Sequence, residues 1–340
     1  MAVTLCVEPR KVVSWDEFIR DYPRYSIAID GFCSGPTRSS VGGLRLNINH
    51  HESDEAVRRA IEHPDEVGAL SHAQEVQSVG RLPLRSTCDQ ALCLVKLGLF
   101  ETYQHGGKPT ARLWVNDCDQ DVVLATYVLM HPWAADVKLF RELERIEDYL
   151  DMSAGLFPVK RRWSVVRRLC WITEEYTRVK QDGSLFTMGA KEMGACILRM
   201  HERVRETLDT GGQELDPDTE FAVLEDHGFW QVVQEVGAHA RLGMAEAGIK
   251  AFLSVISRQP GHYRYTLARL SPFIPFPVDR LCEELNRVEG YGPDDPSRWG
   301  GSDTVGGSMR GNGSSLPPAE VIKVIEDWLR KNDLPPQRAL

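Results

Sequence analysis

The sequence lacks several features that would assign it to a class at once. It carries 40 Lys and Arg against 49 Asp and Glu, a net charge of −9, and so lacks the basic excess of duplex DNA binders. None of its eight cysteines forms a CxxC pair, which argues against a zinc ribbon. The longest apolar stretch, near residues 122–130, is far shorter than the roughly 20 residues of a membrane span. We therefore expect neither a duplex DNA partner nor a membrane partner.

What is present describes a folded protein of more than one domain. Of the 340 residues, 42% are hydrophobic and 26% are charged, which is enough apolar surface for real cores. The cysteines are scattered, as is typical of reduced and buried thiols. The first residues, MAVTLCVEPRK, lack the basic start and long apolar run of a signal peptide, so we expect a cytoplasmic protein.

The first 155 residues alternate strand-like and helix-like runs. Apolar, strand-like runs occur at 26–30, 44–48 and 113–115, and helical patterns occur at 54–63, after Ser86, and from Val122. This succession is typical of a layered α/β domain with a parallel sheet.

The remainder is mixed. Helical spacing is found at 191–208 and 229–248, strand-like runs at 251–255 and 263–267, and further helices at 278–289 and from Pro318 to Lys331. The sequence therefore predicts three consecutive parts: an α/β domain at 1–155, a helical segment at 156–248 and a smaller α+β domain at 249–340.

Four acidic and histidine-bearing segments occur in the first domain, and three of them lie at or near the ends of predicted strands. They contain Asp30, then Asn49, His50 and His51, then the alternating triplet Asp117, Asp119 and Asp121, and last the segment from Asp148 to Asp151. Strand ends are where open α/β sheets present ligands, and hard divalent ions suit this set of oxygen and nitrogen donors. Taken singly, each segment has an ordinary explanation as a turn or a helix cap.

Together, these segments resemble the DHH phosphoesterase superfamily. Its members have an aspartate after a strand, an Asp-His-His motif some twenty residues later, and a helix that opens with small hydroxyl residues. Asp30, residues 49–51 and residues 85–92 occur in that order. The family's aspartate-rich turn matches the triplet at 117–121, and its last metal-binding aspartate matches Asp151.

The sequence departs from the family pattern in two ways. Asn49 stands where the family has the aspartate of Asp-His-His, so this position accepts hydrogen bonds but brings no charge. The aspartate-rich turn also follows the histidine motif, whereas it normally precedes it. A circular permutation would explain this order, because the termini of domains often lie close together. The other explanation is that the triplet is wrongly matched.

The C-terminal part resembles the Gly-rich loop of the accessory domain that often accompanies DHH domains. That loop contacts the substrate, which here implies contacts by Gly300, Gly301, Ser302, Gly306, Gly307 and Arg310. Glycines let backbone N–H groups approach an anion closely. Arg269, which follows a predicted strand, could also reach a phosphate. The alternative is a surface linker.

The resemblance implies a hydrolase that uses two Mn²⁺ (or Mg²⁺) ions to activate water. The implied metal ligands are Asp30, His50, Asp117, Asp119, Asp121 and Asp151, and the implied catalytic residues are Asn49, His51 and Arg269. The low basic content favours a small phosphorylated substrate such as a nucleotide, a short oligonucleotide or a metabolite phosphate, and a homodimer is compatible with it. Asn49 keeps open the alternative of a non-catalytic nucleotide-binding or regulatory protein with the same fold.

Overall fold

Two compact units make up the chain, and they interleave along the sequence. The computed structural model describes residues 2–50, 85–259, 261–293, 295–309 and 312–332. Unit 1 contains residues 1–148 and 164–215, and unit 2 contains residues 149–163 and 216–340. This division differs from the three consecutive parts expected from the sequence, because the helical middle is shared between the two units.

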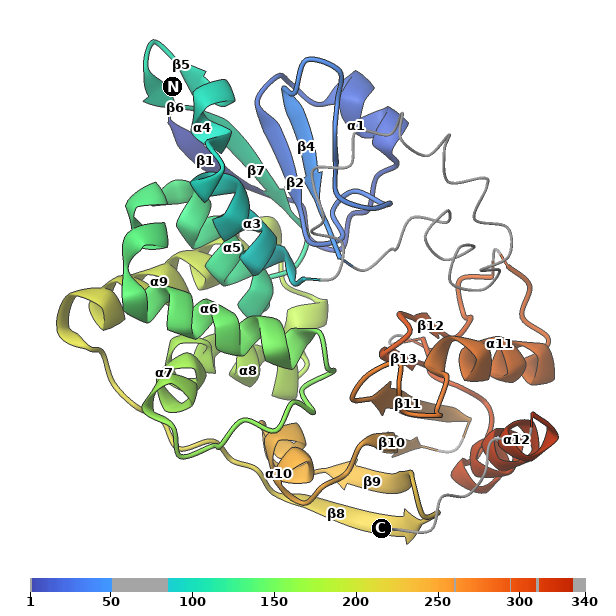
Figure 1. Cartoon of the computed structure of the whole chain (residues 1–340). Coiled ribbons are helices and arrows are strands. Elements are labelled where there is room, and N and C mark those ends of the chain that lie inside the picture. Colours follow the sequence, from blue (N-terminus) through green and yellow to red (C-terminus); the bar gives the residue numbers. More distant parts are fainter. Residues whose placement is uncertain (1, 51–84, 260, 294, 310–311, 333–340) are drawn as a thin grey trace. The chain divides into compact units, whose positions relative to one another are not determined.

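Unit 1 is built on a five-stranded sheet (Figure 1). Its strands, in spatial order, are β1 (Val3–Val7), β7 (Ala111–Val115), β2 (Ser26–Ile29), β4 (Arg45–Ile48) and β3 (Arg38–Ser39). The first four run parallel, and only β3 is antiparallel to its neighbour β4. The mixed α/β class with a parallel sheet is therefore confirmed. Strand β1 was not among the strands expected from the sequence.

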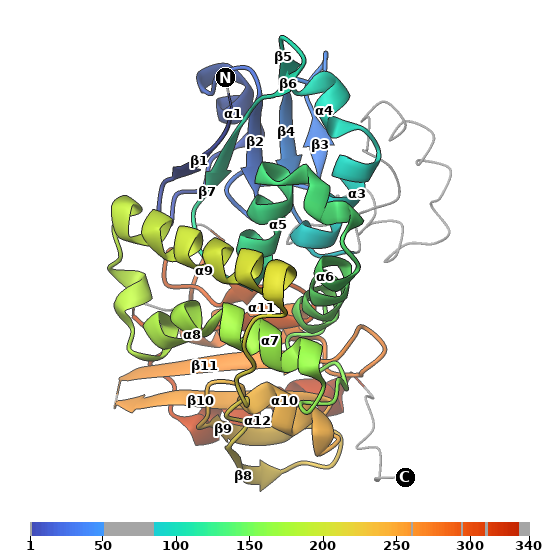
Figure 2. The same ribbon diagram turned by 90° about the vertical axis from the view of Figure 1, so that its left-hand side faces the viewer.

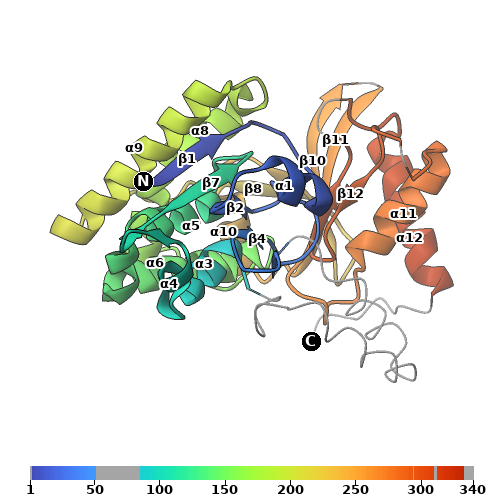
Figure 3. The same cartoon turned by 90° about the horizontal axis from the view of Figure 1, so that it is seen from above.

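The helices of unit 1 cover both faces of this sheet. On one face, Phe18 of α1 and Tyr22, the residue that follows this helix, pack with Phe32 and Trp114 in an aromatic cluster, and α3 and α5 lie on the other face (Figure 3). Helices α7 and α8 pack against the long helix α9 (Figure 2). The bounds of these helices and of the neighbouring elements are α1 (Trp15–Asp21), α3 (Thr87–Lys96), α4 (Leu99–Thr102), β5 (Gln104–His105), β6 (Lys108–Pro109), α5 (Gln120–Met130), η3 (Pro132–Asp136), α6 (Lys138–Asp151), α7 (Ser164–Ile172), α8 (Glu174–Gln181), η4 (Ser184–Phe186) and α9 (Ala190–Thr210).

Two of these helices begin where side-chain caps were expected. Ser86 caps α3 by accepting the N–H of Asp89, and Asp119 caps α5 by accepting the N–H of Val122 at 2.9 Å. The expected helix at 54–63 lies outside the described residues. In the described part of the chain, no helix is long and apolar enough to cross a membrane.

Unit 2 is built on a six-stranded sheet with helices on both faces. Helices α11 and α12 share one apolar core with the sheet, and α10 packs on the opposite face against Val233, Phe252 and Ala268. The sheet order is β12 (Gly300–Gly301), β13 (Val305–Gly307), β11 (His262–Arg269), β10 (Ala251–Gln259), β9 (Gln231–Glu235) and β8 (Phe221–Asp226). The helices are α10 (Ala240–Glu246), α11 (Val278–Glu289) and α12 (Pro318–Lys331).

The expectation of a single helix at 229–248 is wrong. Its first half is strand β9, and only residues 240–246 are helical. Val232 and Val233 are β-branched, and each lies in a different apolar core, one on each face of the sheet. A strand therefore buries both side chains, because successive residues point to opposite faces. At Gly237 the backbone comes so close to Asp218 that a Cβ would lie 2.4 Å from its carbonyl oxygen.

The Gly-rich hairpin β12–β13 needs its glycines for packing. A Cβ on Gly307 would lie 2.3 Å from the carbonyl oxygen of Tyr265, and one on Gly306 would lie 2.9 Å from the Cys282 sulfur. Nothing lies within 4 Å of the corresponding position at Gly300. The small residues are therefore explained by close contact with β11 and α11.

We predict that Gly307→Ala destabilises the protein by about 1–3 kcal/mol, because the added methyl group clashes with backbone in a packed sheet. Gly300→Ala is the matched control in the same hairpin and should change stability little. Urea denaturation of both variants measures the difference. Equal stability of the two variants would contradict the packing explanation.

Candidate metal site at the edge of the parallel sheet

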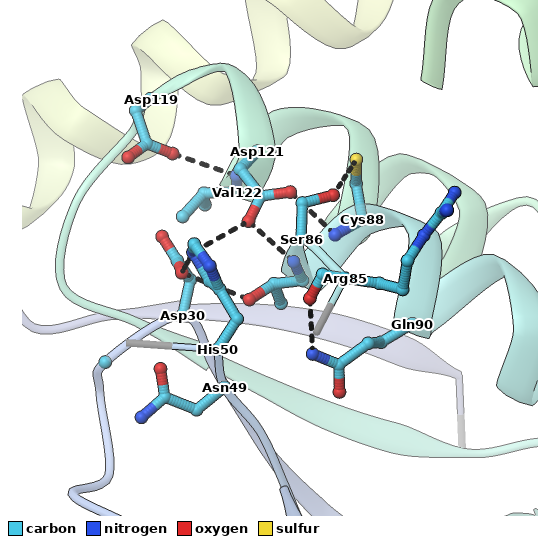
Figure 4. A network of polar contacts seen from close by, with 12 residues as sticks. Asp30, Asn49, His50, Arg85, Ser86, Cys88, Gln90, Asp119, Asp121 and Val122 are labelled. Atoms are coloured by element: carbon cyan, nitrogen blue, oxygen red, sulfur yellow. Dashed lines mark hydrogen bonds and ion pairs between the residues drawn. The ribbon is translucent and has the colours of Figure 1, made fainter. Parts of the chain in front are cut away.

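Asp30, His50 and Asp121 converge beyond the carboxyl ends of the parallel strands (Figure 4). One ligand atom from each residue lies within 4.8 Å of those from the other two. His50 Nε2 is 3.4 Å from Asp30 Oδ1 and 3.8 Å from Asp121 Oδ2. The side chains of all three are at least nine-tenths buried. We call these three residues the triad.

Two neighbouring strands bring Asp30 and His50 together. Ile29 and Ile48 are paired at the ends of β2 and β4, so the residues that follow them emerge at the same sheet edge. The N–H of Asp30 donates to the Ile48 carbonyl at 2.9 Å. Asp30 has a left-handed φ of 49°, which aspartate tolerates better than most residues. The chain therefore turns away from the strand direction directly after Ile29.

The amino end of α3 fixes the two carboxylates. Asp121 lies in the first turn of α5 and accepts the N–H groups of Thr87 at 2.8 Å and of Cys88 at 2.6 Å. The hydroxyl of Thr87 donates to Asp30 Oδ1 at 3.1 Å. These N–H groups have no acceptor within their own helix, and the helix dipole favours a negative charge there. A carboxylate that accepts such hydrogen bonds can also bind a cation.

Three other expected metal ligands lie outside the triad. Asp119 uses its carboxylate to cap α5, and Asp117 Oδ1 accepts the N–H of Cys118 at 2.7 Å. Burial, followed by the negative charges of Asp30, Asp117 and Asp121, raises the pKa of Asp119 well above its ordinary value. Asp151 closes α6 and belongs to unit 2. Cys118 is fully buried, as the sequence predicts for a soft thiol beside a hard site.

Helix α6 supplies carboxylates that were not among the expected metal ligands. Asp148 Oδ1 accepts the N–H of Ser86 at 3.0 Å, and its Oδ2 lies 2.9 Å from Arg85 Nη2. The missed signal is the spacing of Glu144, Glu147 and Asp148, which places three acids on the buried face of a helix. Asp148, and not Asp151, is thus the α6 aspartate that the structure brings to the start of α3.

Glu144 is the least compensated of these acids. Its side chain is buried, and Oε1 has no hydrogen-bond partner among the described groups. Burial, followed by the charges of Asp89, Asp121 and Asp148, raises the pKa of Glu144 well above its ordinary value. The interior beside the triad therefore carries more acid than its basic groups balance.

Asn49 connects the histidine segment to the neighbouring loop. Its Nδ2 donates to the Gly35 carbonyl at 2.9 Å, and its backbone N–H donates to Thr37 Oγ1 at 3.0 Å. Thr37 Oγ1 in turn lies 2.5 Å from Gln90 Oε1 of α3. This buried amide holds the backbone just before His50, which is a positioning role and uses the N–H₂ group that an aspartate would lack.

Several of the residues expected to bind substrate in unit 2 also have roles in its fold. Arg269 is buried, and its guanidinium donates to the carbonyls of Asp303 at 2.7 Å and Ile274 at 3.2 Å. The N–H of Ser302 closes the hairpin turn onto Val305 at 2.7 Å. Arg269 therefore organises two turns, and the glycines pack as described above. His51 and Arg310 lie outside the described residues.

No protein-family model matches the sequence, and no curated protein matches it.

We predict that Asn49→Asp destabilises the protein by about 1–3 kcal/mol, because a carboxylate would face the Gly35 carbonyl without a donor. The matched control is Asn332→Asp, since the exposed Asn332 donates in the same way to the Trp328 carbonyl at 2.8 Å. Urea denaturation measures both changes. An Asn49→Asp variant as stable as the parent would show that the amide is not needed as a donor.

A second prediction concerns pH. The pKa of Glu144 is raised in the folded chain, so folding is opposed above its ordinary value of 4.5, where the unfolded chain ionises freely. The opposition is absent below that value, grows as the pH rises from 4.5 towards the raised pKa, and stays constant above the raised pKa. Glu144→Gln should therefore stabilise the metal-free protein more at pH 8 than at pH 5, by on the order of 1–2 kcal/mol. Denaturation at both pH values is the measurement, and a difference independent of pH would refute the argument.

Proposed function

We propose that the chain is a metal-dependent phosphoesterase, similar to the DHH superfamily, that hydrolyses a phosphate ester or anhydride of a small substrate. The observation that carries this proposal is the triad of Asp30, His50 and Asp121. These residues are buried at the carboxyl ends of the adjacent parallel strands β7, β2 and β4, where α5 begins after β7. Topology of this kind places ligands at the carboxyl ends of strands.

The donors of the triad suit a hard or borderline divalent ion. Two carboxylates and one imidazole nitrogen within 4.8 Å of each other form a set that Mn²⁺ or Mg²⁺ accepts. A bound ion would acidify a water molecule and polarise a phosphoryl oxygen. A second ion would draw on Asp119, which is close enough to Asp30 and Asp121 for their charges to raise its pKa.

The residues around the triad support it in ways that a metal site requires. Thr87 and Cys88 fix the orientation of the Asp121 carboxylate through two N–H groups, and the Thr87 hydroxyl fixes Asp30. Asn49 holds the backbone before His50. Hydrogen bonds to ligand side chains set their geometry before an ion binds.

A second candidate, a nucleotide- or phosphate-binding or regulatory protein without catalysis, is favoured by one observation. Both oxygens of Asp121 accept N–H groups of α3, which gives this carboxylate a structural use that needs no metal. Asn49, which stands where the DHH family has an aspartate, also favours this second candidate, because an amide brings no charge to the site.

We predict that His50→Ala lowers both Mn²⁺ affinity and phosphoesterase activity, the latter by about a hundredfold or more, because it removes a ligand. His105→Ala, at an exposed position in β5, is the control and should change neither. Calorimetric titration with Mn²⁺ and assays on a broad phosphate panel are the measurements. A parent protein that binds no Mn²⁺ and hydrolyses nothing would end the proposal, and tight binding of one phosphate without hydrolysis would favour the second candidate.

Asp119→Asn tests whether a second ion is held. Asparagine caps a helix as well as aspartate does, so α5 should remain intact while the charge is lost. If two ions bind, the variant should lose one of them, seen as a change from two to one in the titrated Mn²⁺ stoichiometry. An unchanged stoichiometry would show that Asp119 is only a cap.

A further inference from the structure

Among the residues that the structure describes, β8 is the last strand of the six-stranded sheet in unit 2 and has a neighbouring strand, β9, on one side only, so its other side is an open edge (Figure 1). Residues 222–226 are all exposed, including Val223 at 49% and Leu224 at 37%. Open edges with apolar side chains favour pairing with another strand, and proteins usually protect them. This edge therefore needs an explanation.

The direction of the free backbone groups follows from the pairing with β9. The N–H of Val236 donates to the Glu220 carbonyl, which makes these two residues a hydrogen-bonded pair. Because such pairs alternate along an antiparallel ladder, Ala222 also faces β9, while Phe221 and Val223 turn their N–H and C=O groups to the open edge. Val223 can therefore exchange hydrogen bonds with an added strand.

A pocket opens beside this edge. It has a volume of about 520 Å³. Leu224, the extra residue of a bulge between Val223 and Glu225, lines it on the side of β8. The other lining residues, mostly apolar, are Glu225, Val232, Val255, Tyr263, Pro318, Ala319 and Ile322. A site of this composition fits an aliphatic side chain.

The charge carried by β8 and the residues just before it is of one sign, and Arg161, which donates to Thr219 Oγ1 at 2.7 Å, is a cation beside this segment. The segment 216–226 contains five acids and no Lys or Arg. Glu220, Glu225 and Asp226 are exposed at the two ends of β8. Such a field attracts a basic segment and repels a second copy of the same acidic strand.

We propose that β8 and this pocket, together called the β8 groove, bind an extended basic segment of a partner protein. The segment adds a strand to the open edge and places one aliphatic side chain in the pocket. Main-chain hydrogen bonds supply affinity in this mode of recognition, and the pocket supplies specificity. The proposal is independent of the metal site and of any phosphoesterase activity.

Acidic residues and a bulge can also serve only to prevent aggregation at an edge. That role explains the charges and the bulge, but it requires no apolar pocket. Leu224 serves the pocket because the bulge turns it there, and Val223 remains exposed on the edge itself. The combination fits recognition better than protection alone.

The test uses the full chain and a fluorescent peptide, Lys-Val-Lys-Leu-Lys-Val, with binding measured by anisotropy. We expect saturable binding that Val223→Pro weakens by about tenfold or more, because proline removes the N–H that faces the edge. Leu224→Asp should weaken it similarly. The matched control is Val288→Asp, the same charge change at a comparably exposed valine of α11, which should bind within about twofold of the parent.

A second peptide, Lys-Pro-Lys-Leu-Lys-Pro, keeps the charge and the leucine but cannot extend a ladder. It should bind at least about tenfold more weakly. Equal binding of both peptides, or equal effects of Leu224→Asp and Val288→Asp, would reduce the interaction to net charge and overturn the proposal. Absence of binding to the parent would overturn it as well. So would dimerisation of the parent that Val223→Pro abolishes, since the occupant would then be a second copy.

Discussion

The contact on which the first unit depends most is the one between the Asp121 carboxylate and the first turn of α3. Two N–H groups, from Thr87 and Cys88, converge on this side chain at 2.8 and 2.6 Å. The contact joins helices whose starts are far apart in the sequence, and through the Thr87 hydroxyl it also joins the end of β2. Without it, the start of α3 would be buried with unsatisfied donors, and Asp30 and Asp121 would have nothing to hold them close together.

The same arrangement creates an electrostatic cost. Burial of several carboxylates raises the pKa of Asp119, Glu144 and Asp148, while Arg85 is the guanidinium that pairs with Asp148. Buried acids with raised pKa values are protonated or bound to a cation, because uncompensated charge is costly in a low-dielectric interior. A divalent ion at the triad would reduce this cost, which links the stability of unit 1 to the proposed activity.

The sequence predicted the parts of the site that depend on local rules. Strand ends at Asp30 and His50 and the cap at Ser86 follow from short patterns of apolar and hydroxyl residues, and the structure contains them. Asp119, expected as a metal ligand with a helix cap as the alternative, caps α5. In the last acidic segment the resemblance pointed to Asp151 and not to Asp148, because the partner of a carboxylate on a helix cannot be identified until the neighbouring helix is known. The expectation of a helix in place of β9 was wrong, because Val232 and Val233 fit both the helical and the strand spacing of apolar residues. Only the pairing with β10 and β8 on its two sides makes this segment a strand.

Residue type alone did not reveal the structural roles of the glycines and Arg269. Both residue types are typical of phosphate sites, and here Gly306 and Gly307 allow close packing of a hairpin, while Arg269 donates to the carbonyl groups of Asp303 and Ile274. In the triad, hydrogen bonds from the start of α3 fix both Asp30 and Asp121. Carboxylates fixed in this way are compatible with the proposed cation, because a carboxylate can accept a hydrogen bond and bind a metal ion at the same time.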